Sequence, residues 1–264
     1  MKGDYTMHLN KGYKTILFIL LFGVSFSCVA IAKTVEFVVP WSAGGGSDTM
    51  ARFIVKSIKD NNLTDADFVV AHKPGGNGQI GSAYVMKKSG RPNTWMTLSS
   101  GQISIPLAGL GKIKATHFTA LTQMAGDVNL LVVSKDSPLK SVEDVAKAAK
   151  ANPGKLNVGG SGTAGEDHLC TYLLGKGIGA EMNYTSFSGG GEVMSNLLGG
   201  HIDVAWANPN ECISQVRGGL VKMLAITKED RLALLPDVPS FKELGYDIVF
   251  WQVRGVHGPP NMPQ

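Results

Sequence analysis

The sequence contains few cysteines and little net charge, and these shortages exclude several classes of protein. Only three of its 264 residues are cysteine. Cys170 and Cys212 lie beyond the N-terminal segment and could form one disulfide in an oxidising compartment, or stay single; we favour unpaired thiols. The formal net charge is +4, and it falls to +2 without the three lysines and one aspartate of the first 32 residues. Because binding to a phosphate backbone needs a concentrated basic face, we expect no nucleic-acid partner.

The sequence also lacks the short motifs that mark common exported enzymes. It contains no G-x-S-x-G, no H-E-x-x-H and no C-x-x-C. No predicted bend therefore supplies a nucleophile with a paired base. We expect a protein that is not an enzyme and needs neither metal nor cofactor. An exported enzyme or a sensory ligand-binding module on the same scaffold is the alternative.

Acidic residues are absent from Phe68 to Gly126, and this gap argues against a nucleotide site. The run Gly76–Gly81 matches G-x-G-x-x-G between a predicted strand and a predicted helix. A dinucleotide site also needs an acid about 20 residues later to hold the ribose. We therefore expect these glycines to allow a close approach of helix to strand.

No apolar run is long enough to span a membrane, but residues 1–32 have the pattern of a secretory signal peptide. Two lysines precede an apolar stretch over residues 16–26, and Ala30-Ile31-Ala32 forms a small-residue cleavage site. A lipoprotein anchor at Cys28 is the alternative, although the three residues before it are a poor lipobox. We expect a soluble periplasmic protein that begins at Lys33.

The stretch from Val35 to Ile58 predicts a strand, a glycine-rich bend and a helix. The apolar run stops at Pro40, and helical spacing of apolar residues begins after three consecutive glycines. Ser47 or Asp48 is the expected N-cap. Several backbone N–H groups would then face one concavity at the positive end of a helix dipole, which favours an anion. The alternative is an ordinary turn whose glycines only ease a tight path.

The second half of the chain repeats this design. Residues 155–158 predict a strand, Gly159–Gly165 a glycine and hydroxyl bend, and the residues from Glu166 a helix. The repeated alternation of strand and helix predicts an α/β fold with parallel, doubly wound sheets, whose ligands lie beyond the carboxyl ends of the strands. Two such bends, one in each half, suit a ligand held between two lobes.

Six stretches in order resemble one known family. They read VVPWSAGGGSDTMAR, KPGGNGQIG, SVEDVAKAAKANPGKLNVG, GTAGEDHL, FSGGGEVMSNLLGGHIDVAWANP and LLPDVPSFKELGY. Together they look like the substrate-binding proteins of tripartite tricarboxylate transporters, the Bug-type receptors, over essentially the whole chain after the leader.

The resemblance implies a bilobed periplasmic-binding-protein fold of type II-like architecture, with two mostly parallel sheets joined by a two-crossing hinge. Residues 33–129 and 248–264 would form the first lobe, and residues 130–247 the second. Family members usually continue for several dozen residues in helices that pack on the first lobe, so we expect those helices to be missing here. The resemblance further implies a monomeric receptor that binds a small organic carboxylate and delivers it to the permease subunits of a membrane transporter.

The resemblance places the ligand between the two bends. Ser161 and Thr163 are good candidates because neutral hydroxyls donate to a carboxylate at little electrostatic cost. The expected ligand-binding residues are Trp41, Ser42, Ala43, Gly44, Gly45, Ser47, Ser161, Gly162, Thr163, Gly165, His168 and Asp203.

Several residues in or near this set have a structural alternative. Asp48 suits an N-cap better than a ligand contact, since its carboxylate would repel an anion. His168 could instead lie on the face of the helix without contacting the ligand. Asp203 could instead stabilise the end of a strand. Trp206 is expected in the core, whereas Trp41 would narrow the cleft or offer a stacking face.

Overall fold

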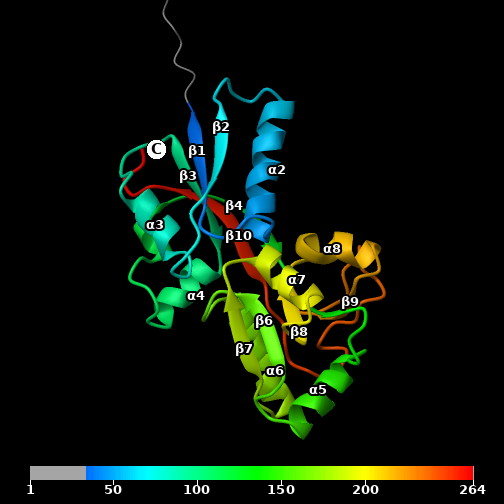
Figure 1. Ribbon diagram of the computed structural model, residues 1–264. Helices are drawn as coiled ribbons and strands as arrows, with labels where there is room; N and C mark the ends of the chain where they lie inside the picture. Colours follow the sequence, from blue (N-terminus) through cyan, green and yellow to red (C-terminus); the bar gives the residue numbers. More distant parts are fainter. Residues whose placement is uncertain (1–33, 264) are drawn as a thin grey trace, which may run out of the picture. The chain divides into compact units, whose positions relative to one another are not determined.

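A computed structural model of the chain describes residues 34–263 (Figure 1). The expected signal peptide and the alternative anchor at Cys28 lie outside these residues. The described part forms one compact unit built from two mixed five-stranded sheets and their helices. The α/β class with two sheets is therefore confirmed.

The first sheet has the strand order β2-β1-β3-β10-β4. Strands β1, β2 and β3 are parallel, while β10 runs antiparallel to both of its neighbours. The last strand of the described chain thus lies inside the sheet rather than at its edge. The elements of this part are β1 (Val35–Val39), α2 (Gly46–Asp60), β2 (Phe68–His72), α3 (Gln79–Met86), β3 (Thr94–Ser99), α4 (Gly101–Leu107), η1 (Ala115–His117), β4 (Thr119–Asp127) and β10 (Gln252–Gly258).

The second sheet has the strand order β7-β6-β8-β5-β9. Strands β6, β7 and β8 are parallel, and β5 is antiparallel to both β8 and β9. The elements are β5 (Leu130–Ser134), α5 (Val142–Ala151), β6 (Asn157–Ser161), α6 (Glu166–Ile178), β7 (Asn183–Phe187), α7 (Gly190–Leu198), β8 (Val204–Ala207), α8 (Pro209–Arg217) and β9 (Val221–Ile226).

Strand β5 is apolar on both faces because helices cover the second sheet from two sides. Leu131 and Val133 belong to one buried cluster, and Leu130 and Val132 to another. This alternation follows from the two-residue period of a strand. Trp206 is fully buried in the first of these clusters, as expected.

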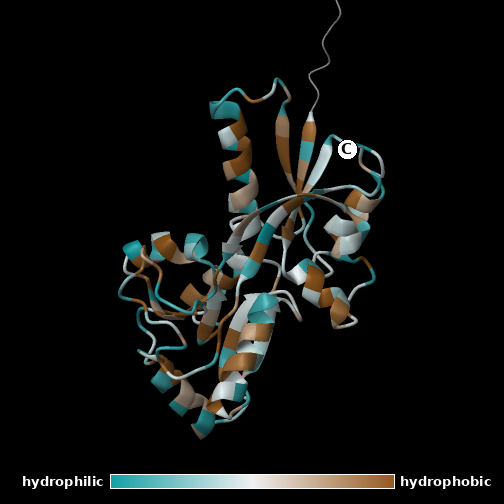
Figure 2. Cartoon of the chain, turned by 180° about the vertical axis from the view of Figure 1, so that it is seen from behind, coloured by the Kyte–Doolittle hydropathy of each residue, from teal (hydrophilic) through white to brown (hydrophobic). Residues whose placement is uncertain are grey.

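The first sheet is covered in the same way by α2 and α3. Phe37 and Val39 pack with Ala51 of α2, whereas Val38 packs with Val85 of α3 on the other face. Helix α2 shows hydrophobic and hydrophilic residues side by side along its length (Figure 2), as an amphipathic helix does. Cys170 and Cys212 are free and buried, which confirms the expectation of unpaired thiols.

The G-x-G-x-x-G run serves packing, as expected. A Cβ on Gly81 would lie 2.7 Å from Pro40 Cβ and 2.9 Å from Pro40 Cα. Only glycine therefore lets α3 approach the end of β1 this closely.

The chain passes between the sheets twice, and both crossing segments are hydrogen-bonded to Thr227. Thr227 Oγ1 accepts from the backbone N–H of Asn129 at 3.0 Å and donates to the carbonyl of Phe250 at 3.0 Å. Backbone bonds join the same three residues. The crossings are therefore held side by side at Thr227.

Candidate functional site

A small cavity lies where the carboxyl ends of strands from both sheets meet. Its volume is about 30 Å³, enough for about one or two water molecules. Three carboxylates and one guanidinium are among its lining groups. The lining residues are Trp41, Gly45, Gly46, Ser47, Ser99, Ser161, Glu166, Asp167, Gly189, Gly190, Asn208, Glu211, Gln252 and Arg254.

The first glycine bend begins helix α2, but its cap differs from the expected one. The N-cap is Gly45 and makes no side-chain bond, whereas Asp48 in the first turn accepts from the N–H of Gly44 at 3.0 Å. Gly44 has φ +83°, a conformation that favours glycine. Ser47 lies inside the helix, so the expectation of a cap at Ser47 or Asp48 is wrong.

Asp48 stabilises the bend rather than facing the cavity. It also bonds Arg52 Nε at 2.9 Å and His72 Nε2 at 2.8 Å. Burial alone would raise the pKa of Asp48, but the Gly44 N–H, Arg52 and His72 outweigh it and lower that pKa. This agrees with a structural role for Asp48.

The carboxylate of Glu211 occupies the amide-rich corner that was expected to hold the ligand. Its Oε1 accepts from the N–H of Gly46 at 2.7 Å, and its Oε2 accepts from the N–H of Asn208 at 2.8 Å. A Cβ on Gly190 would lie 2.4 Å from this carboxyl group. Burial raises the pKa of Glu211, while these N–H groups and the charge of Arg254 act in the opposite direction.

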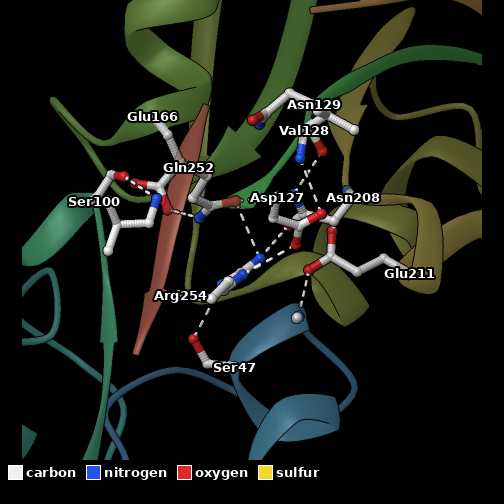
Figure 3. A network of polar contacts seen from close by, with 12 residues as sticks. Ser47, Ser100, Asp127, Val128, Asn129, Glu166, Asn208, Glu211, Gln252 and Arg254 are labelled. Carbon is white, nitrogen blue, oxygen red and sulfur yellow. Dashed lines mark hydrogen bonds and ion pairs between the residues drawn. The ribbon is translucent and has the colours of Figure 1, made fainter. Parts of the chain in front are cut away.

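Arg254, on β10, links the two sheets through one buried guanidinium (Figure 3). It donates to Asp127 at 3.0 Å, Asn208 at 2.6 Å, Gln252 at 3.0 Å and Ser47 at 3.3 Å. Its charge is therefore already paired with the Asp127 carboxylate.

Helix α6 begins with two buried acids. The Glu166 carboxylate accepts from the side-chain amide of Gln252. The Asp167 carboxylate accepts from the N–H of Ser161 at 2.7 Å and from the side-chain amide of Asn129. Burial raises the pKa of both carboxyl groups, and for Asp167 the neighbouring Glu166 charge adds to the effect.

The backbone N–H groups of the second bend donate hydrogen bonds to other groups of the protein. Besides the bond from Ser161, the N–H of Gly162 donates to Phe187 O at 3.0 Å, and that of Thr163 to Asn77 Oδ1 at 3.1 Å. The N–H of Ala164 donates to His168 Nδ1 at 3.0 Å. In this arrangement four amides of the expected anion cradle already have partners.

The structure brings together four of the residues expected at the ligand. Trp41, Gly45, Ser47 and Ser161 line the cavity. Ser42, Ala43, Gly44, Gly162, Thr163 and Gly165 lie in the two bends but outside its lining.

His168 and Asp203 lie elsewhere. The His168 ring stacks on Tyr184, with 4.2 Å between ring centroids, beside a separate surface groove. Asp203 accepts from the N–H of Asn157 at 2.8 Å, at the start of β6, whereas the cavity lies at the far end of that strand near Ser161. The structure therefore supports a strand-end role for Asp203.

Sequence reasoning missed the charged groups of the cavity. Glu166 and Glu211 look like ordinary acidic residues in a first helical turn. The available signal for Arg254 was its position in an apolar stretch of the sequence. A charged side chain that is buried with such a stretch needs paired partners, which predicts a polar cluster around it.

With this geometry in view, comparison with known proteins decides the family. Residues 54–264 match the family model described as "Tripartite tricarboxylate transporter family receptor". The chain belongs to this family. The resemblance found in the sequence is thereby confirmed, and the family is one of periplasmic receptors.

Individual relatives of this receptor cover most of its length. Protein BugT of Bordetella pertussis is 30% identical over 222 residues, which are 81% of this chain and 67% of BugT. A protein in the gbd 5' region of Cupriavidus necator is 29% identical over 233 residues, covering 86% of this chain and 69% of the relative.

Solved structures of similar proteins share the fold. Rpa4515 of R. palustris, described with adipate, has a TM-score of 0.82 and 27% identity, covering 88% of this chain and 78% of that protein. Periplasmic binding protein BugD has a TM-score of 0.78 and 25% identity, with the same coverage. Among the described residues of this receptor, every helix is too short or too polar to cross a membrane.

Proposed function

We propose that this chain is a periplasmic receptor that binds a small organic carboxylate between its two sheets and delivers it to the permease subunits of a membrane transporter. The observation that carries the proposal is the polar cavity where the first glycine bend meets helices from the second sheet. Family membership supports it, as does Rpa4515, whose structure is described with adipate.

We further propose that the two sheets act as lobes that separate to admit the ligand. A space of about 30 Å³ holds one or two water molecules, and an organic carboxylate is several times larger. The hydrogen-bonded crossings at Asn129, Thr227 and Phe250 would serve as the hinge. Ligand binding would then shift the population towards the closed form.

The lobe boundaries follow the sheets. We assign residues 33–129 to the first lobe and residues 130–247 to the second. Ile248 packs in the core of the second sheet, so the return to the first lobe is better placed at β10, which begins at Gln252. We also propose that the protein is a monomer, is not an enzyme and is exported by its N-terminal segment.

Within the cavity, Ser47 and Ser161 are the neutral hydroxyl groups expected to donate to the ligand carboxylate. Ser47 Oγ already accepts from Arg254, which leaves its proton available to a ligand. Trp41 would border the body of the ligand, since its ring lies between the glycine loops of both sheets.

A thermal-shift screen of organic acids tests the function. A ligand present at about 100 times its dissociation constant should add about 2.7 kcal/mol to the free energy of unfolding. We expect at least one carboxylate to raise the melting temperature, and the double variant Ser47→Ala/Ser161→Ala to weaken that response. Ser195→Ala, an exposed change on α7, is the matched control. Stabilisation by neutral solutes alone would contradict the proposal.

A further inference from the structure

The segment from Phe68 to Gly126 carries positive charge only. It contains six lysine and arginine residues and no aspartate or glutamate, whereas the rest of the chain after residue 32 has more acidic than basic residues. The six are Lys73, Lys87, Lys88, Arg91, Lys112 and Lys114. Between positions 34 and 263, none of them forms an ion pair. This part of the first lobe is therefore positive in a protein that is negative elsewhere.

The fold gathers these charges on the flank of the first sheet that carries α3 and α4, away from α2 (Figure 1). The loop after α4 lies against the start of α3, because Gln79 Nε2 donates to Ile113 O at 3.2 Å and Gln79 Oε1 accepts from Ile113 N–H at 3.1 Å. Farther along, Phe118 packs on the buried cluster that α3 shares with the sheet. The exposed side chains of Lys112 and Lys114 therefore lie in a loop that runs beside α3.

Two more lysines are held near α3 by an aromatic ring. Lys73 Nζ lies 4.5 Å and Lys88 Nζ 4.8 Å from the centroid of the Tyr84 ring, whose face attracts cations. The Tyr84 hydroxyl donates to the carboxylate of Glu36, an acidic group from outside the segment. One carboxylate against two ammonium groups leaves this end of the flank positive.

Exposed apolar side chains lie on the same flank. Leu107 is 77% exposed, and Ile103, which is also exposed, lies four positions earlier on the same face of α4. Exposed Ile80 follows Gln79 at the start of α3, and exposed Leu110 belongs to the loop that Gln79 holds. Single exposed apolar side chains are common on protein surfaces, but a group of them on adjoining segments is typical of an interaction site. Because interfaces with nucleic acid are more polar, this mixture of apolar and basic groups favours a protein partner.

This flank also contacts the second lobe, so its surroundings depend on closure. Ser104 Oγ of α4 donates to the carbonyl of Ala164 in the second bend at 2.8 Å. This bond would break if the lobes separate. A partner that contacts α4 and its surroundings can therefore distinguish a closed receptor from an open one, which favours a transport protein over a lipid surface as the partner.

We propose that α3, α4 and the loop over residues 108–117, together the α3–α4 face, dock on an acidic periplasmic segment of the permease. This inference rests on the proposed function, because it places the permease on the receptor. Carboxylates of the permease would pair with the lysines, which speeds the encounter and fixes the orientation of the two proteins. Apolar side chains of the permease would cover Ile103 and Leu107 and supply affinity through burial.

Cosedimentation tests the α3–α4 face with the purified receptor and the permease subunits reconstituted in phosphatidylcholine vesicles. We expect the receptor to bind these vesicles, and Lys112→Glu/Lys114→Glu to bind about tenfold more weakly at low salt. Raising the NaCl concentration from about 50 to about 300 mM should weaken the wild type more than this variant, because salt screens the charge pairs. Lys150→Glu/Lys155→Glu makes the same charge change at exposed residues of the second lobe, and this matched control should bind like the wild type.

A separate variant tests the apolar part of the face. Leu107→Asp should weaken binding to the permease vesicles several-fold at both salt concentrations, because it places a charge where apolar contact is expected. In this variant and in both double variants, the melting temperature and the affinity for a carboxylate from the screen should stay at the wild-type values. The altered residues are exposed and lie outside the cavity lining.

Three results would overturn the inference and leave the proposed function intact. The first is wild-type binding by Lys112→Glu/Lys114→Glu, and the second is an equal loss in the two double variants, which would show an effect of net charge alone. The third is equally tight binding to vesicles of phosphatidylcholine and phosphatidylglycerol without permease, which would show that the face recognises lipid. If the wild type binds a carboxylate but no permease vesicles, delivery to the permease fails together with this inference.

Discussion

The carboxylate of Glu211 accepts a hydrogen bond from the backbone N–H of Gly46 at 2.7 Å, although 165 positions separate the two residues. Glu211 lies in the first turn of a helix of the second sheet, and Gly46 begins a helix of the first. The protein thus provides its own carboxylate for the positive end of α2. This contact would break if the lobes separate, so it contributes to the balance between open and closed forms.

The pH dependence of stability should reveal the buried state of Glu211. Burial raises the folded-state pKa of this group, whose ordinary value is 4.5. Its contribution to stability is therefore complete below pH 4.5 and is lost as the pH rises through the higher folded-state value. Glu211→Gln has no such group, so we expect its free energy of unfolding to fall less than that of the wild type as pH rises from 4.5 to neutral.

Urea denaturation at several pH values measures this difference. Glu143→Gln, which alters a side chain that is 75% exposed, should follow the wild-type curve. Parallel curves for Glu211→Gln and the wild type would show that Glu211 does not titrate differently on folding.

Arg254 should be essential for stability. Arg254→Met leaves Asp127 without its ion-pair partner and Asn208 and Gln252 without a donor. Removing one partner of a buried ion pair costs about 3 to 5 kcal/mol, which urea denaturation would measure. Arg52→Met is the control because Arg52 is 59% exposed, and its buried partner Asp48 keeps the hydrogen bonds from Gly44 and His72; its cost should be about 1 kcal/mol. Equal costs for the two variants would contradict the assigned role of Arg254.

Thr227 should hold the two crossing segments together. Thr227→Val keeps the shape of the side chain but removes the acceptor for Asn129 N–H and the donor for Phe250 O. We expect a loss of about 1 to 3 kcal/mol in the free energy of unfolding, since Asn129 is buried. Thr64→Val, a change at an exposed loop residue, should be nearly neutral by the same measurement.

The two hydroxyl groups of the second bend should differ in their effect on ligand binding. Ser161 lines the cavity, whereas the Thr163 hydroxyl donates to Ser186 Oγ at 3.0 Å and lies outside the lining. Ser161→Ala should weaken binding of a carboxylate found in the screen by about 1 kcal/mol, as measured by calorimetry. Thr163→Ala should weaken it less; the reverse order would place the ligand on the Thr163 side of the bend.

Local sequence patterns predicted the strand, bend and helix units because each depends on neighbouring residues. The unit from Val35 to Asp60 appears where the apolar periods and glycines place it. In the second unit, β6 spans Asn157–Ser161 and not the expected residues 155–158, so the strand includes the first three residues of the expected bend. Near the C-terminal end the apolar residues begin at Ile248, four positions before β10, which spans Gln252–Gly258. Ile248 and Phe250 are apolar because they pack on the core of the second sheet, not because they pair in a strand.

Only some of the cavity residues could be predicted, because a local sequence pattern records neighbouring residues and not distant partners. Trp41, Ser47 and Ser161 lie in or next to bends whose form is local, so the sequence alone predicted them. Arg254 and Glu166 act on partners 127 and 86 positions away, and no local period records such distances. Only the topology, which inserts β10 between β3 and β4, brings these charges together.

The position of β10 also has a consequence for how the chain folds. All strands of the second sheet are contiguous in sequence, so that half can assemble as soon as it has been synthesised. The first sheet cannot be completed until residues 252–258 are available, because β10 pairs with both β3 and β4. Such non-local pairing is slow, and it delivers the Arg254 guanidinium in the same step. Completion of the first sheet and assembly of the binding cavity are therefore expected to be one late event.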